Sequence, residues 1–128
     1  MTTKKMMRKL LKSKIHRAVV TRSDLNYDGS IAVDEALVEG AGFLPYEAVQ
    51  VWNINTGQRL ETYVIPAARD SGEICLNGAA ARLAQQGDLI IICSFCWLDD
   101  EEARHHVPKT VRVDSRNRVQ STTQRGAL

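Results

Sequence analysis

A serine that directly follows a glycine in a predicted turn, Gly29-Ser30, offers the most specific chemistry in this sequence. The serine hydroxyl can attack the preceding carbonyl carbon, because glycine has no side chain to obstruct the approach and tolerates strained backbone angles. If a donor stabilises the oxyanion, the acyl group moves from nitrogen to oxygen. β-Elimination of the ester would split the chain and leave dehydroalanine, which hydrolyses to a pyruvoyl group. The dipeptide alone is common and indicates only an ordinary turn.

A second pattern overlaps the same turn and suggests calcium binding. The residues from Asp24 to Glu35 match the EF-hand calcium loop, with Gly29 at its turn position. An EF-hand loop also needs a helix on each side. Val19 and Val20 predict a strand before the loop, and glycines at 40 and 42 shorten the helix after it. The sequence therefore favours a turn over a calcium site.

The segment Cys93-Ser94-Phe95-Cys96 has the spelling of a metal-binding or redox pair. Residues three apart on a strand point to opposite faces, so these two thiols do not converge on one metal without a bulge. No second pair completes the four ligands of a structural zinc site. We therefore expect these thiols and Cys75 to be buried and inert, and we predict no metal site.

Length and composition indicate one globular domain covering residues 1–128. The chain is 44% hydrophobic and 25% charged, and no apolar run approaches the roughly 20 residues of a membrane helix. The N-terminus lacks the apolar stretch of a secretory signal. Three cysteines without disulfide-like spacing favour a reducing compartment, so we expect a cytoplasmic protein without membrane contact.

Residues 1–22 carry basic side chains and no acidic one. Such a segment is typical of nucleic-acid binding or of contact with another anionic surface, so the alternative function is a small β-barrel that binds nucleic acid. The segment lacks the aromatic or glycine interleaving that stacks bases. The composition agrees better with a segment that is solvated or that contacts an acidic face of a partner subunit. We therefore expect no nucleic-acid partner.

The hydrophobic pattern predicts many short strands and only short helices. A hairpin is indicated where Asn55-Thr56-Gly57 separates two apolar runs, and Asp34 is a suitable helix cap. This pattern favours a small closed barrel. We predict strands at 15–22, 31–33, 48–54, 58–65, 73–76, 88–98 and 110–114, helices at 34–40 and 79–86, a polar helical turn at 99–105, and a flexible tail at 115–128.

Several ordered blocks extend the Gly-Ser pair into a longer pattern. This pattern resembles the pyruvoyl-dependent L-aspartate 1-decarboxylase family from about Met7 to about Val113. The resemblance implies a mainly β fold, a small six-stranded double-psi β-barrel with short helices. It also implies a homotetramer with active sites at the subunit interfaces. The blocks are Lys14-Ile15-His16-Arg17, Asp24-Leu25-x-Tyr27-x-Gly29-Ser30, Trp52-Asn53, Gly57-x-Arg59, Thr62-Tyr63, Asn77-Gly78-Ala79-Ala80-Ala81, Gly87-Asp88-x-Ile90-Ile91-Ile92 and Asp100-Glu101-Glu102-Ala103-Arg104.

The family chemistry implied by the resemblance begins with self-cleavage between Gly29 and Ser30. The products are a β chain, residues 1–29, and an α chain, residues 30–128, which opens with a pyruvoyl group derived from Ser30. The pyruvoyl carbonyl forms a Schiff base with L-aspartate and accepts the electrons released on decarboxylation, as pyridoxal phosphate does elsewhere. Decarboxylation of L-aspartate yields carbon dioxide and β-alanine, which is used for pantothenate biosynthesis. Whether a maturation factor assists the cleavage stays open.

The resemblance also implies the substrate contacts. Tyr63 is the proton donor to the substrate carbon. Arg59 offers a bidentate fork for one substrate carboxylate and Lys14 a point charge for the other. Tyr27 and Trp52 are expected as pocket walls. Without the resemblance, a packed tyrosine and solvated cations would be the usual interpretation.

The remaining residues implied by the resemblance lie on two short segments. Thr62 hydrogen-bonds the Gly29 oxyanion during processing and the substrate afterwards, and Asn77 orients the scissile turn. The backbone N–H groups of Gly78, Ala79 and Ala80 suit an anion. Thr62 and its neighbour Tyr63 should point to opposite faces of a regular strand, so joint contact with one site requires a strand end, a bulge or backbone contacts.

Overall fold

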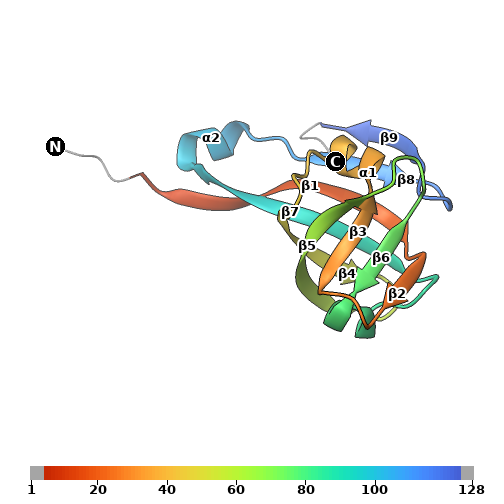
Figure 1. Cartoon of the computed structure of the whole chain (residues 1–128). Helices are drawn as coiled ribbons and strands as arrows, with labels where there is room; N and C mark the ends of the chain where they lie inside the picture. Colours follow the sequence, from red (N-terminus) through yellow and green to blue (C-terminus); the bar gives the residue numbers. More distant parts are fainter. Residues whose placement is uncertain (1–4, 125–128) are drawn as a thin grey trace.

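The computed structural model describes residues 5–124, and in this part of the chain nine strands form a single sheet with three short helices (Figure 1). The strands are β1 (Met7–Val19), β2 (Arg22–Asp24), β3 (Ser30–Asp34), β4 (Ala48–Asn53), β5 (Arg59–Ala67), β6 (Ile74–Asn77), β7 (Leu89–Asp99), β8 (Lys109–Val113) and β9 (Val119–Thr123). The helices are α1 (Glu35–Ala41), the 3-10 helix η1 (Gly78–Arg82) and α2 (Asp100–His105).

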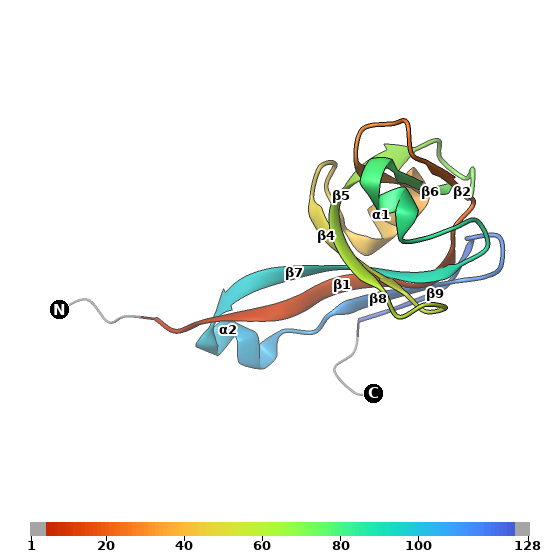
Figure 2. The ribbon, with the colours of Figure 1, turned by 90° about the horizontal axis from the view of Figure 1, so that it is seen from below.

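The sheet has the strand order β2-β6-β3-β5-β4-β7-β1-β8-β9. Three of its pairings are parallel, namely β1 with β8, β2 with β6 and β3 with β5, and the others are antiparallel. Figure 2 shows the long pair β1 and β7 running side by side out of the curved body of the sheet, with α2 near its outer end. The mainly β fold with short helices is confirmed. The sheet contains nine strands within residues 5–124, and the six-stranded double-psi barrel stays a prediction.

The core consists of small aliphatic side chains from the inward faces of the strands. Ile15, Val51, Val64 and Ile92 all have 2% exposure or less and belong to one cluster. Strand β4 alternates buried and accessible residues, as one half-buried sheet face requires. For the same reason Ile91 is only partly buried between two fully buried neighbours.

Helix α1 begins and ends as its sequence predicts. The Asp34 carboxylate accepts a hydrogen bond from the Ala36 N–H at 2.9 Å, and Gly42 ends the helix in the left-handed conformation with φ 73°. Asp34 is buried and also accepts from the N–H groups of Asp70 and Gly72. The cap residue therefore also holds the turn that precedes β6.

Three predicted boundaries are wrong. The first strand is β1, which begins at Met7 and ends at Val19, and a separate short strand β2 follows it. The predicted helix 79–86 is the five-residue 3-10 helix η1. The predicted flexible tail contains the buried Asn117 and strand β9, which pairs with β8. Strand β9 is exposed along its whole length, so it has no apolar pattern to predict it; residues 125–128 lie outside the described residues.

The basic segment is not a free arm. Strand β1 lies between β7 and β8 in the sheet, and acidic partners neutralise several of its cations. The Lys12 ammonium lies 2.9 Å from the Glu47 carboxylate, and the Arg8 guanidinium 2.6 Å from that of Asp100. The nucleic-acid alternative therefore loses its structural basis from Met7 onward.

Within residues 5–124, no helix has both the length and the apolar character needed to cross a membrane.

Candidate active site

Ser30 lies where an exposed loop enters the buried part of the sheet. Tyr27, Asp28 and Gly29 are exposed, whereas Ser30, the first residue of β3, is 2% exposed. Its hydroxyl lies 3.5 Å from the Asp28 carbonyl oxygen. The bond between Gly29 and Ser30 therefore has an accessible side and a side held by the sheet.

The side chain of Asn77 holds the Ser30 oxygen. The two residues are directly opposite in the antiparallel pair of β3 and β6, and the Asn77 Nδ2 group donates to Ser30 Oγ at 3.0 Å. Asn77 is 4% exposed, and its Oδ1 accepts from the Cys75 thiol at 3.2 Å. The sequence interpretation placed Asn77 at the scissile turn but treated Cys75 as inert. The spacing of two residues on one strand, which puts both side chains on one face, was the available signal.

Close packing at the loop before Ser30 requires a glycine at residue 78 but not at residue 29. A Cβ on Gly29 would meet nothing within 4 Å, and Gly29 is not among the glycines with positive φ. Gly29 therefore does not adopt the left-handed conformation that glycine tolerates. Gly78 has φ 63°, and a Cβ there would lie 2.8 Å from the Gly29 nitrogen and from the Tyr27 carbonyl oxygen. Gly78 thus lets the start of η1 pack against the loop that precedes Ser30.

A cavity of about 400 Å³ brings several of the predicted residues together. Thr62 is half-buried and Tyr63 is 37% exposed. The lining residues are Gly29, Leu60, Glu61, Thr62, Tyr63, Ala79, Ala80 and Leu83. A loop glycine next to Ser30, a hydroxyl, a phenol and two small residues of η1 therefore share one space.

The sheet register explains how consecutive residues of β5 line one cavity. Strand β3 pairs with β5 only from Ile31 opposite Val64 onward. Before Val64, the edge of β5 that faces Gly29 has no β3 partner, while its other edge pairs with β4. Side chains from both faces of β5 can reach a cavity at such an open edge. The end of the β3 pairing therefore resolves the conflict between Thr62 and Tyr63.

The two predicted carboxylate-binding cations are not among the residues that line this cavity. The Arg59 guanidinium lies over the Trp52 ring, 4.4 Å from its centroid, and Lys14 lies in β1 opposite Cys93. Burial raises the pKa of the Cys93 thiol to about 11, and the positive charges of Lys14 and Arg59 oppose this shift. Both cations therefore lie near Cys93.

Tyr27 is exposed in the loop and contributes its backbone oxygen to the Gly78 contact.

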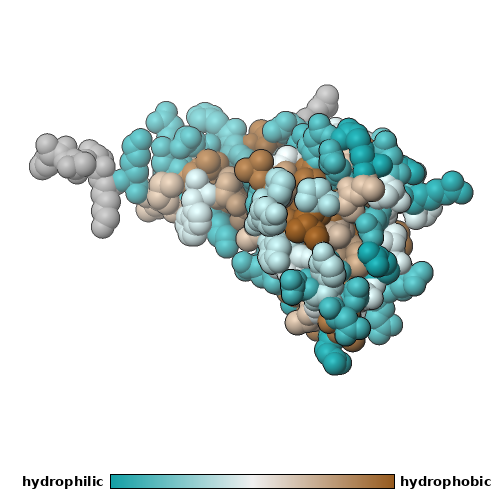
Figure 3. Space-filling model, in the orientation of Figure 1, coloured by the Kyte–Doolittle hydropathy of each residue, from teal (hydrophilic) through white to brown (hydrophobic). Residues whose placement is uncertain are grey.

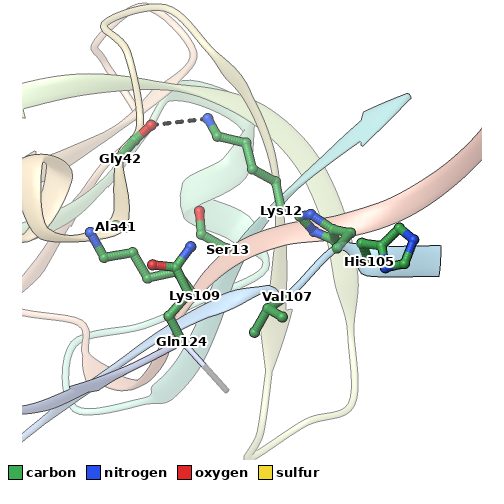
Figure 4. Close-up of a pocket in the computed structure, with 9 residues that line it drawn as sticks. Lys12, Ser13, Ala41, Gly42, His105, Val107, Lys109 and Gln124 are labelled. Atoms are coloured by element: carbon green, nitrogen blue, oxygen red, sulfur yellow. Dashed lines mark hydrogen bonds between the residues drawn. The ribbon is translucent and has the colours of Figure 1, made fainter. Parts of the chain in front are cut away.

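A different cavity of about 510 Å³ lies beside β1, β8 and the end of α1 and contains none of the predicted site residues (Figure 4). The Lys12 ammonium, which lines it, donates to the Gly42 carbonyl oxygen at 2.9 Å and is paired with Glu47. The His106 ring, also on its wall, lies 2.7 Å from the Leu11 carbonyl oxygen. Lys12 and His106 are thus engaged with other groups of the fold, whereas the buried Ser13 hydroxyl on the same wall has no hydrogen-bond partner.

The calcium-loop pattern does not form an EF-hand. Strands β2 and β3 flank the turn, and the Asp24 carboxylate accepts a hydrogen bond from the Asn26 N–H at 3.0 Å. Glu35 is exposed at the start of α1, 3.7 Å from the Arg69 guanidinium. Among residues 5–124, no group of three or more His, Cys, Asp or Glu side chains is arranged to hold a metal ion.

In this small, mainly β protein, the side chains of Ser30, Asn77, Thr62 and Tyr63 lie around one loop and supply hydroxyl, amide and phenol groups suited to an enzyme. The chain belongs to the aspartate decarboxylase family, whose model matches residues 6–120. Aspartate 1-decarboxylase of Caldicellulosiruptor saccharolyticus is 59% identical over 114 residues, 89% of each chain. The Thermoanaerobacter pseudethanolicus enzyme of that name is 57% identical, over 88% of this chain and 97% of its own. The Bacillus subtilis enzyme is 51% identical, over 90% and 91%.

Proposed function

We propose that this chain is a self-processing, pyruvoyl-dependent decarboxylase that converts L-aspartate into β-alanine, for pantothenate biosynthesis, and carbon dioxide. The observation that carries the proposal is the hydrogen bond of 3.0 Å from Asn77 to Ser30, beside a cavity that Thr62 and Tyr63 line. The relatives named aspartate 1-decarboxylase support the reaction. The family membership supports the same assignment.

Self-cleavage starts with attack of the Ser30 oxygen on the Gly29 carbonyl carbon. The peptide C–N bond breaks as the ester forms. In this proposal Thr62 stabilises the oxyanion, which its position on the wall of the same cavity as Gly29 supports. β-Elimination then breaks the ester C–O bond of the serine side chain. Residues 1–29 end in a carboxylate, and residue 30 becomes dehydroalanine. Hydrolysis with loss of ammonia leaves the pyruvoyl group at the start of residues 30–128.

The pyruvoyl carbonyl supplies the electron acceptor that decarboxylation of an amino acid requires. The surrounding residues fit such a group, because Ser30 is buried on one side and Gly29 opens on the cavity. Tyr63 returns a proton to the substrate carbon from its exposed phenol. Ala79 and Ala80 leave room for the substrate, since their methyl groups are small.

The active protein is a homotetramer in this proposal, with each site completed at a subunit interface. Lys14 and Arg59 lie outside the cavity of their own chain, so a neighbouring copy has to bring them to the substrate carboxylates. Figure 3 shows apolar residues gathered in the middle of the face that carries β1 and β5. Large apolar side chains such as Leu44 and Trp97 are 69% and 64% exposed. Exposed apolar surface of this kind suits burial between the subunits of an assembly.

A cytoplasmic location belongs to the same proposal. The three cysteines, Cys75, Cys93 and Cys96, are free thiols, which is usual in a reducing compartment. Cell fractionation with an antibody to the protein tests this location. Recovery in the membrane or secreted fraction would contradict it.

Intact mass spectrometry of the purified protein tests the proposed function. We expect two chains that break between Gly29 and Ser30, the larger with a ketone at its end that borohydride fixes to aspartate. Ser30→Ala should give one intact, inactive chain. Ser71→Ala, at an exposed turn serine, is the matched control and should process normally. A wild-type chain that forms β-alanine while its Ser30 hydroxyl is intact would refute the proposal.

A further inference from the structure

Three buried side chains form a continuous hydrogen-bonded row that ends at the scissile serine. The Cys75 thiol donates to Asn77 Oδ1 at 3.2 Å, and Asn77 Nδ2 donates to Ser30 Oγ at 3.0 Å. Exposure is 0% for Cys75, 4% for Asn77 and 2% for Ser30. Water therefore does not compete for these groups, and each hydrogen bond strongly constrains the orientation of the next side chain.

The sheet register sets the row in place. Cys75 and Asn77 are two residues apart on β6, so they share one face, while Ile74 and Leu76 belong to the hydrophobic core. Strand β3 places Ser30 opposite Asn77 and Ala32 opposite Cys75. The small methyl group of Ala32 leaves Cys75 without a polar partner on β3. The nearest acceptor for its thiol proton is then Asn77 Oδ1, since the Leu76 carbonyl oxygen lies farther away at 3.9 Å.

A donor at position 75 decides which end of the Asn77 amide faces the serine. An asparagine side chain has an accepting oxygen and a donating nitrogen, and a half-turn exchanges them. Burial raises the pKa of the Cys75 thiol, while the charge of Arg22 opposes the shift, so the thiol keeps its proton at neutral pH. The protonated thiol favours the amide oxygen on its own side. The amide nitrogen is thereby turned toward Ser30.

The orientation of the amide affects the first step of self-cleavage. The Ser30 oxygen gains negative charge as it attacks the Gly29 carbonyl carbon, and its proton ends on the Ser30 nitrogen, which becomes an amine when the peptide C–N bond breaks. An N–H donor 3.0 Å away stabilises that charge. The reversed amide would place a carbonyl oxygen there, which repels the charge. We propose that Cys75 is a positioning residue for self-cleavage, acting through the orientation of Asn77; this inference rests on the proposed function.

The test compares Cys75→Ala with Cys75→Ser in a pulse-chase measurement of the intact full-length chain. Both variants remove the sulfur atom, but only alanine removes the donor. We expect cleavage of Cys75→Ala to slow by about fivefold, the equivalent of one ordinary hydrogen bond. Cys75→Ser should cleave within about twofold of the wild-type rate, because its hydroxyl restores the donor. Melting temperatures of the precursors show whether both variants are folded.

Cys93→Ala and Cys93→Ser are matched controls at the other fully buried thiol, and neither should change the cleavage rate. The inference is overturned if Cys75→Ala cleaves at the wild-type rate, or if Cys75→Ser is as slow as Cys75→Ala. A wild-type chain that never cleaves would instead refute the proposed function, and this inference with it. If the wild-type chain cleaves normally and Cys75→Ala cleaves at the same rate, the role of Cys75 is refuted but the proposed function is not.

Discussion

Gly78 packs so closely on Gly29 that a Cβ at residue 78 would lie 2.8 Å from the Gly29 nitrogen. The contact joins the start of η1 to the loop that precedes Ser30. Gly78 also has φ 63°, which side chains rarely adopt. The position of this loop therefore depends on a residue 49 positions after Gly29 in the sequence.

We expect Gly78→Ala to destabilise the precursor and to slow its cleavage strongly. The left-handed φ alone costs about 1–2 kcal/mol, and the contacts with Gly29 and Tyr27 add to this cost. Gly57→Ala is the matched control, since Gly57 has φ 77° with open space around its Cβ. It should lower the melting temperature without slowing cleavage. Equal melting temperatures and equal cleavage for the two variants would show that the contact is unimportant.

Tyr63→Phe should leave self-cleavage intact and reduce decarboxylation. Removal of a proton donor costs about a hundredfold or more in turnover, measured as carbon dioxide released per pyruvoyl group. Tyr46→Phe is the control, because its ring lies 6.4 Å from that of Tyr63 but outside the cavity. Full turnover by Tyr63→Phe would remove Tyr63 from the mechanism.

Mixed assemblies should show whether two chains build each site. Lys14→Ala and Ser30→Ala are each expected to be inactive, but their co-expression should restore part of the activity. At some interfaces an intact Ser30 of one copy then faces an intact Lys14 of the other. Tyr63→Phe mixed with Ser30→Ala is the control, since both residues belong to the same chain's site and no interface is complete. If the first mixture shows no rescue, Lys14 does not act on the Ser30 site of a neighbouring chain.

The Lys12 pair with Glu47 should make stability depend on pH in the acid range. Burial alone would raise the pKa of Glu47, but hydrogen bonds from the Leu44 N–H and the Lys12 ammonium hold it below the ordinary 4.5. A carboxylate with a lowered pKa stabilises the fold above pH 4.5, and this contribution is lost as the pH falls through the folded-state pKa.

Melting temperatures between pH 3 and 7 test this dependence, at acidities that span the ordinary carboxyl pKa of about 4. Glu47→Gln should lower the melting temperature at pH 7 and flatten its fall toward low pH. Glu101→Gln, at an exposed carboxylate, should follow the wild-type curve. A Glu47→Gln curve parallel to that of the wild type would contradict the assignment.

Local signals in the sequence predicted the elements that depend on neighbouring residues. The Asp34 cap, the Gly42 helix end and the hairpin of β4 and β5 are all confirmed. Each depends on contacts within a few residues or on a turn with known chemistry. The ordered motifs also predicted that Asn77 lies at the turn of Ser30, and the two side chains are hydrogen-bonded; their role in one site stays a prediction.

Features that depend on distant contacts could not be predicted. Strand β9 lacks an apolar face, and the order around it comes from Asn117, whose amide binds the Val19 backbone and the Gly72 carbonyl oxygen. The role of Gly78 depends on a close approach that spacing does not reveal. The donor role of Cys75 depends on the register of β3 and β6.

The pairing order of the sheet also determines how the two fragments of the proposed cleavage after Gly29 would be held together. The shorter fragment contains β1, which is bonded on both sides by β7 and β8, and β2, which is bonded by β6. All three neighbours belong to the longer fragment. Ile15 and Val20 of the shorter piece are also fixed within the common hydrophobic cluster. The two pieces should therefore co-purify as a single folded body and come apart only in denaturant.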